Sequence, residues 1–188
     1  DRKEGLMETK ELENNLRNLD QNVLALSQSI QNMRNSISQC YIQADSLESR
    51  AQALMSMASG EEDQSAATKM YSQASACMNK VSAYRMQAES LQSQMGGMIS
   101  ELSGYKSEYQ SYMAEGQTNL ANLRTAADQL TGIVGSKYGA AKIKEALVAT
   151  KQRMVYNQNL VNGCQKRISW IEQICGLSSD SYTKVKRR

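Results

Sequence analysis

The stretch that decides the fold is residues 12–40, LENNLRNLDQNVLALSQSIQNMRNSISQC. Most of its side chains are polar, but its apolar residues recur at alternating steps of four and three. Extended to residue 58, the series has fourteen positions, and all are apolar: Leu12, Leu16, Leu19, Val23, Leu26, Ile30, Met33, Ile37, Cys40, Ala44, Leu47, Ala51, Leu54 and Ala58. This sustained repeat predicts a coiled-coil helix that buries one narrow stripe.

A second series with the same spacing follows the segment SGEEDQS, residues 59–65. Ser59 and Gly60 suit the end of a helix, and the acidic run 61–63 suits the positively polarised start of the next one. The second series is also apolar at all fourteen positions: Ala67, Met70, Ala74, Cys77, Val81, Tyr84, Ala88, Leu91, Met95, Met98, Leu102, Tyr105, Tyr109 and Tyr112. Two equal stripes joined by a short turn predict an antiparallel helical hairpin that closes near Gly60.

The apolar frame then shifts, because steps of four at Tyr105, Tyr109 and Met113 form a stutter, which locally unwinds a coiled coil. The shifted frame continues through Gly116, Leu120, Leu123, Ala127 and Leu130. The glycines of LTGIVGSKYG, residues 130–139, predict a break. A third stripe follows the break: Ile143, Leu147, Met154, Val161, Cys164, Ile168, Ile171 and Cys175.

These patterns predict an all-α fold, an elongated antiparallel helical hairpin or coiled coil with a third long helix packed on it. We expect helices at about 3–58, 62–130 and 138–176, all within one elongated domain of residues 1–177. Residues 178–188 are expected to form a basic tail or linker. The third helix should fold back along the second helix and cover the wider end of the hairpin.

Some seam positions carry residues that are not large aliphatics. Thr150 and Asn157 fill gaps in the third stripe, and a buried polar residue on a seam can fix helix register at a cost in stability. The four cysteines lie on seams, which is typical of small buried thiols. Across the hairpin, Cys40 and Cys77 are several residues out of register, which argues against a disulfide.

Two interpretations of the glycine pair Gly96-Gly97, inside the second helix and off its seam, stay open. The pair is either a weak point that costs about 1 kcal/mol per glycine relative to alanine, or a hinge or close helix contact.

Composition argues against several functions. The chain has no His, no Pro and no Phe, and its cysteines show no C-x-x-C spacing. We therefore predict no enzyme, no catalytic, cofactor-binding or metal-ligating residue, and no cofactor. No run approaches the roughly 18 apolar residues that span a bilayer. Because the chain opens at Asp1 without Met, we expect it to be part of a longer protein.

Charge is unevenly distributed. Residues 1–136 carry 11 Lys and Arg against 16 Asp and Glu, net −5, whereas residues 137–188 carry 11 against 3, net +8. The basic third helix either docks on the acidic hairpin or presents a patch to an acidic partner or a membrane surface. A membrane surface is not the favoured partner. Nucleic acid is not predicted, because no aromatic or recognition motif interleaves with the charge.

Residues 120–175 resemble the helix–turn–helix of the LXG/WXG100 superfamily. A long helix leads to Leu130-Thr131-Gly132 and then to a helix beginning in SKYGAAKIKEAL. The superfamily joins two antiparallel helices by a W-x-G or L-x-G turn. The resemblance implies a substrate, or an N-terminal toxin-targeting domain, exported by a Gram-positive type VII secretion system together with small helical partners.

The candidate interaction surface is the turn end of the second and third helices. Beyond the stutter the hairpin no longer buries all of the second helix, and exposed apolar surface marks interaction sites. The candidate residues are Leu120, Leu123, Leu130, Gly132, Ile133 and Val134.

We therefore expect a non-enzymatic helical protein–protein interaction or targeting module. Its expected partners are small helical proteins or further copies of the chain. Export to the cell surface or medium is the expected localisation, and the cytoplasm is the alternative. The alternative functions are a self-associating coiled-coil spacer and a membrane-surface-associated helical scaffold.

Overall fold

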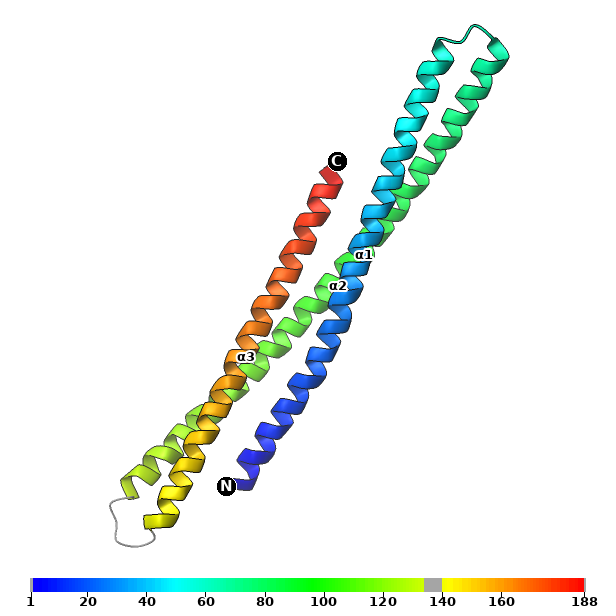
Figure 1. Ribbon diagram of the computed structural model, residues 1–188. Helices are drawn as coiled ribbons and strands as arrows, with labels where there is room; N and C mark the ends of the chain where they lie inside the picture. Colours follow the sequence, from blue (N-terminus) through cyan, green and yellow to red (C-terminus); the bar gives the residue numbers. More distant parts are fainter. Residues whose placement is uncertain (1, 134–139, 188) are drawn as a thin grey trace. The chain divides into compact units, whose positions relative to one another are not determined.

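The structure, a computed structural model, describes the backbone of residues 2–133 and 140–187, and the side chains of residues 9–133 and 140–176. The described residues form three α-helices and no strand: α1 (Arg2–Ser59), α2 (Gln64–Ile133) and α3 (Ala140–Arg187) (Figure 1). The predicted all-α fold, a helical hairpin with a third helix, is confirmed.

Two helix ends differ from the prediction. α2 continues to Ile133, so Leu130-Thr131-Gly132 belongs to the last turn of α2 and not to the connection that follows it. α3 continues to Arg187, through most of the segment 178–188 that was expected to form a basic tail or linker. The physical reason is the same in both places, because Gly132 and Gly176 each lower helix propensity by only about 1 kcal/mol relative to alanine, which a long helix can absorb.

The chain divides into two compact units. The first contains Asp1–Ala25 and Glu101–Cys175, and the second contains Leu26–Ser100 and Gly176–Arg188. α1 and α2 each pass from one unit into the other without a break in the helix. The single domain expected for residues 1–177 stays a prediction.

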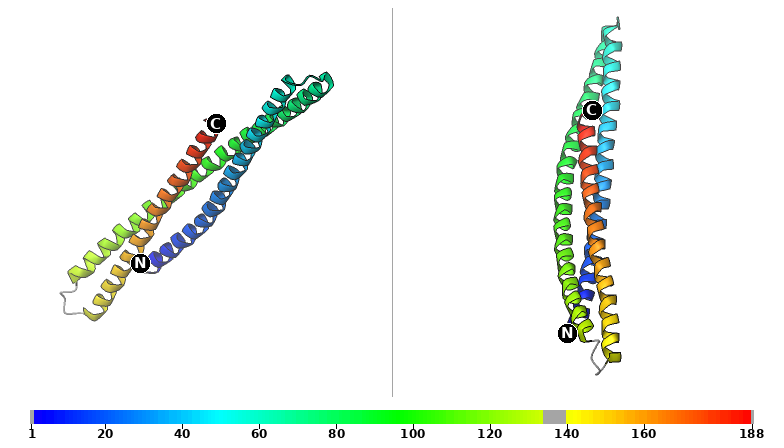
Figure 2. Two further views of the ribbon diagram at one scale, coloured as in Figure 1. Left: turned by 45° about the horizontal axis from the view of Figure 1, so that its top comes forward. Right: turned by 90° about the vertical axis from the view of Figure 1, so that its left-hand side faces the viewer.

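The second unit contains the closed end of the hairpin. Its seam carries alanines from both helices, and Ala44, Ala51, Ala74 and Ala88 are buried. Small side chains let two helix backbones approach closely, so α1 and α2 run side by side up to the turn (Figure 2). Two hydrogen bonds between side chains span the helices: Arg85 donates to Glu48 at 2.7 Å and Gln92 donates to the Tyr41 hydroxyl at 3.1 Å.

The turn of the hairpin lies where the glycine and acidic run predicted it. The N–H of Gly60 donates to the carbonyl of Met57 at 3.3 Å as α1 ends. Asp63 caps α2, because its Oδ1 accepts the N–H of Ser65 at 3.1 Å. Such a cap satisfies an N–H that has no partner inside the helix and stabilises the helix start by about 1 kcal/mol.

The first unit packs three helices together. Lys106 of α2 pairs with Glu172 of α3 at 2.9 Å, and Gly116 of α2 lies against Val161 of α3, so these two helices are antiparallel, as Figures 1 and 2 also show. Its buried apolar residues come from all three helices: Leu12, Leu16, Leu19, Val23, Leu102, Tyr109, Leu120, Ala127, Val161, Cys164, Ile168 and Ile171. The prediction that the third helix folds back along the second is confirmed.

The predicted stripes are the seams of the structure. Every position of the three stripes, including the frame after the stutter, is buried or half-buried. Thr150 and Asn157 are buried too, as their places in the third stripe predicted. All four cysteines are free thiols; Cys40 and Cys164 are buried, whereas Cys77 and Cys175 are half-buried.

Gly96 and Gly97 differ from Gly116 in the space around them. A Cβ at Gly96 or Gly97 would meet no atom within 4 Å, so the interpretation of this pair as a close helix contact is wrong. A Cβ at Gly116 would lie 3.0 Å from Cγ2 of Val161 and 3.8 Å from Cδ2 of Leu12. The close approach of the helices therefore lies at Gly116, where all three meet.

Candidate interaction surfaces

The predicted turn-end residues do not all lie on the surface. Leu120 is buried and belongs to the core of the first unit. Leu123 and Leu130 are half-buried, Gly132 is exposed and Ile133 is 47% exposed. Val134 lies outside the described residues. The end of α2 therefore offers one exposed apolar side chain and two partly covered ones, and their role as an interaction site stays a prediction.

A second group of exposed apolar residues lies on α3, where sequence reasoning did not place a site. Val148 is 55% exposed, Val155 is 62% exposed and Trp170 is 36% exposed. The signal was present in the sequence, because these residues fall between the positions of the third stripe and so point away from the seam.

The helices of the first unit are joined by a polar cluster of Asp20, Tyr109 and Arg167. Nε of Arg167 donates to Oδ1 of Asp20 at 2.6 Å and Nη2 donates to Oδ2 at 2.9 Å, while the Tyr109 hydroxyl also donates to Oδ1. The guanidinium carbon of Arg167 lies 5.9 Å from the centre of the Tyr109 ring. Each helix thus contributes one member.

The electrostatics of this cluster follow from burial and hydrogen bonding. Burial and the hydrogen bond to Asp20 raise the pKa of Tyr109 well above its ordinary value, so the phenol is neutral at physiological pH. Burial alone would lower the pKa of Arg167, but the hydrogen bond and charge of Asp20 raise it overall. The three side chains supply one another's hydrogen-bond partners and opposite charge. The cluster is therefore suited to holding the three helices in register.

Only part of the positive charge of the described residues of α3 is paired with acidic residues of α1. Arg167 pairs with Asp20, and the Tyr156 hydroxyl donates to Glu13 at 2.6 Å, so α3 does contact acidic residues of α1. The other described basic residues of α3 form no ion pair with described residues: Lys142, Lys144, Lys151, Arg153 and Lys166. Docking within the chain therefore accounts for only part of the positive charge of α3.

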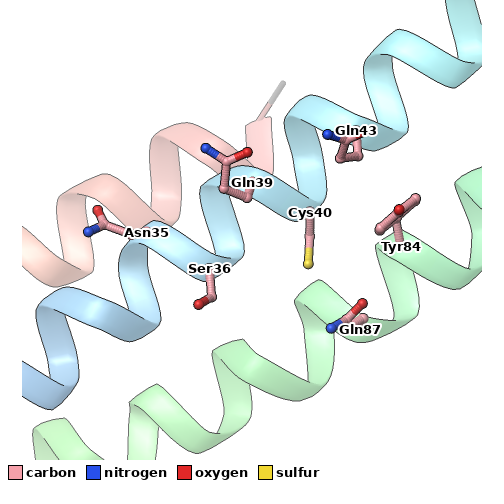
Figure 3. Close-up of a pocket in the computed structure, with 7 residues that line it drawn as sticks. All are labelled: Asn35, Ser36, Gln39, Cys40, Gln43, Tyr84 and Gln87. Atoms are coloured by element: carbon pink, nitrogen blue, oxygen red, sulfur yellow. The ribbon is translucent and has the colours of Figure 1, made fainter.

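The second unit has an open groove between α1 and α2 (Figure 3). Its volume is about 460 Å³, and no charged residue lines it; the lining residues are Asn35, Ser36, Gln39, Cys40, Gln43, Tyr84 and Gln87. Figure 3 shows the Cys40 side chain between the two helices, with its sulfur directed toward α2. Burial raises the pKa of the Cys40 thiol, which disfavours the reactive thiolate.

Residues 9–133 and 140–176 bring together no group of three or more His, Cys, Asp or Glu side chains able to hold a metal ion. No helix there has a segment long and apolar enough to cross a membrane.

The chain has no match among protein-family models, curated protein sequences or solved structures.

Proposed function

We propose that the chain is a non-enzymatic helical interaction module that binds a helical protein partner at the end of α2 beside α3. The observation that carries the proposal is the exposure of Ile133 next to the half-buried Leu123 and Leu130. Leu123 and Leu130 lie on the α2 seam and are only half-buried. One more amphipathic helix would complete their burial, and this mode of recognition is common among helical proteins.

A more specific form of the proposal is a targeting module of type VII secretion. It is supported by the resemblance to LXG proteins, since Leu130-Thr131-Gly132 closes a long helix that an antiparallel helix follows, although here the three residues belong to the helix and not to the connection. In this form the partner is a small helical protein, and the module guides an attached segment to export.

The experiment co-expresses the chain with the small helical proteins encoded by neighbouring genes and measures co-purification. The proposal expects one of them to form a stable complex with the parent chain. A Leu123→Asp, Ile133→Asp double variant should lose that complex, because two charges would have to be desolvated in the contact. Circular dichroism checks that the double variant remains helical.

Two results would count against the proposal. If no neighbouring protein binds, or if the double variant binds as well as the parent, the turn end is not the docking surface. A parent chain that sediments as an oligomer, and loses this oligomer through the same double substitution, would favour a self-associating coiled-coil spacer.

A further inference from the structure

A second surface is built from one repeated unit along α3. Three lysines of α3 each precede an exposed apolar residue by four positions: Lys144 and Val148, Lys151 and Val155, Lys166 and Trp170. Residues four apart share one face of a helix, so the stem of each lysine lies beside its apolar neighbour.

The three units form one stripe. At about 100° per residue, the three apolar residues fall within an arc of roughly 60°. The buried residues Val161, Cys164, Ile168 and Ile171 point to the opposite side of α3, toward the core of the first unit. We call the stripe of Lys144, Val148, Lys151, Val155, Lys166 and Trp170 the outer face of α3.

The lysines of the outer face lack ion-pair partners among the described residues, and its apolar side chains are exposed. All three lysines are exposed, and none forms an ion pair with a described residue. The two acidic residues of the described part of α3 do not offset them, because Glu145 lies beside the stripe and Glu172 pairs with Lys106. The face therefore offers positive charge beside three exposed apolar residues, with the polar Asn159 and Asn162 between Val155 and Trp170.

We infer that the outer face of α3 binds an amphipathic helix of another protein whose apolar stripe is bordered by acidic residues. The charge pattern selects acidic borders, since lysines opposite Asp or Glu favour association and lysines opposite basic residues oppose it. The occupant would lie along about 39 Å of α3, the length of the 26 steps from Lys144 to Trp170 at 1.5 Å each.

An anionic membrane is the competing occupant, and the apolar residues argue against it. Val148 and Val155 are short, β-branched and seven residues apart, which is the spacing and residue type of a helix–helix seam. Helices that lie in a membrane interface rely on Trp, Phe and Leu, and Trp170 is the only one of these on the outer face. The inference rests on the proposed function in one respect, namely that the occupant is a protein helix.

Trp170 makes the inference directly measurable, because it is the only tryptophan of the chain. The full chain is titrated with a synthetic helical peptide of about four heptads that has a Val/Leu stripe bordered by glutamates and no aromatic residue. A matched peptide has lysines in place of the glutamates. Binding should shift the Trp170 emission to shorter wavelength, with an affinity about tenfold higher for the acidic peptide at low salt.

Variants then locate the contact. A Lys144→Glu, Lys151→Glu, Lys166→Glu variant should bind the acidic peptide about tenfold more weakly. An Arg50→Glu, Lys69→Glu, Lys80→Glu variant has the same net charge but changes exposed residues elsewhere, and should bind within about twofold of the parent. A Val148→Ser, Val155→Ser variant should also lose affinity while remaining helical.

Several outcomes would overturn the inference. These are an unchanged Trp170 emission with the acidic peptide, equal affinity for the two peptides, and no effect of the lysine reversals. A Trp170 shift with phosphatidylserine vesicles, but not with the acidic peptide, would assign the face to a membrane. The Leu123→Asp, Ile133→Asp variant should bind the peptide normally, so failure at the turn end and failure at the outer face are separately visible.

Discussion

Arg167 of α3 holds Asp20 of α1 through two parallel hydrogen bonds, although the residues are 147 positions apart in sequence. A bidentate pair of this kind fixes orientation as well as distance, because two donors in one plane must meet two acceptors. The pair therefore sets the position of α3 on the first unit, and Tyr109 adds a contact from α2.

The energetic coupling of this pair can be measured in a double-mutant cycle with Asp20→Asn and Arg167→Gln. Both side chains are partly exposed, so solvent screening keeps the expected coupling at about 1–2 kcal/mol. The exposed pair of Glu13 and Arg17, substituted in the same way, should give only about 0.3–0.5 kcal/mol. Urea denaturation supplies the free energies of unfolding. Equal coupling in the two pairs would mean that the α3–α1 contact does not hold the unit together.

Because its pKa is raised in the folded state, Tyr109 should make the folded protein less stable in alkaline solution. Its pKa is raised in the folded state by burial and by Asp20, while the unfolded phenol titrates near its ordinary value of 10. The stabilisation is complete below pH 10 and is lost as pH rises above it, because only the unfolded state then releases the proton. A Tyr109→Phe variant should show a shallower fall in the free energy of unfolding between pH 9 and about pH 11.

The control for that experiment is Tyr71→Phe, which changes an exposed tyrosine. It should follow the parent across the same pH range. An identical alkaline slope for the parent and Tyr109→Phe would show that the phenol is not held as the structure has it.

Replacing the buried Asn157 with an apolar residue should stabilise the folded protein. Asn157 is 1% exposed, its Nδ2 donates to the carbonyl of Arg153 at 2.9 Å, and its Oδ1 has no hydrogen-bond partner among the described residues. A buried acceptor without a partner costs about 1–3 kcal/mol, so Asn157→Leu should raise the free energy of unfolding by about 1–2 kcal/mol. Asn159→Leu, on the exposed side of α3, should change it by less than about 0.5 kcal/mol. A loss of stability in Asn157→Leu would point to an unseen partner for the amide.

The glycines of α2 allow a comparison at matched backbone positions. Gly97→Ala should raise the free energy of unfolding by about 0.5–1 kcal/mol, because the added methyl meets nothing and helix propensity improves. Gly116→Ala should lower it by about 1 kcal/mol, because its methyl would press on the buried Val161. Chemical denaturation of both variants tests this. The close approach of α2 and α3 would be ruled out by a gain of stability in Gly116→Ala.

Thiol labelling tests the seams without any substitution. Cys40 and Cys164 are buried, and burial raises the pKa of both thiols, so they should react slowly in the native protein. Cys77 and Cys175 are half-buried and should be modified first. Mass spectrometry after timed exposure to iodoacetamide gives the order. Modification of Cys164 as fast as Cys175 would contradict the packing of α3.

The seams could be predicted from the sequence because helix burial repeats with a fixed period. The hairpin turn was predictable for a related reason, since the run of glycine and acidic residues at 60–63 supplies both a helix end and the Asp63 cap. The partial burial of Leu123 and Leu130 also follows from their places in the shifted frame.

Contacts between distant segments were beyond prediction. The periodic pattern shows which face of α3 is buried, but not which residue of α1 meets Arg167 or which backbone Gly116 approaches. Leu120 was expected at the interaction surface, but it is buried in the core of the first unit. The sequence did not single out the outer face of α3, because its valines and tryptophan lie outside the three seam stripes, and the packing of the opposite side is what shows that they are exposed.

The measurement that tests the central claim most directly is the dissociation constant of the complex with the helical partner, determined for three versions of the chain. These are the parent, Leu123→Asp with Ile133→Asp, and Gln117→Asp with Ala121→Asp, a control that places two charges at exposed positions on the opposite side of α2. The account predicts that the double variant binds at least about a hundredfold more weakly, as two desolvated charges imply. The control should bind like the parent. Equal dissociation constants for all three would contradict a docking site at the end of α2.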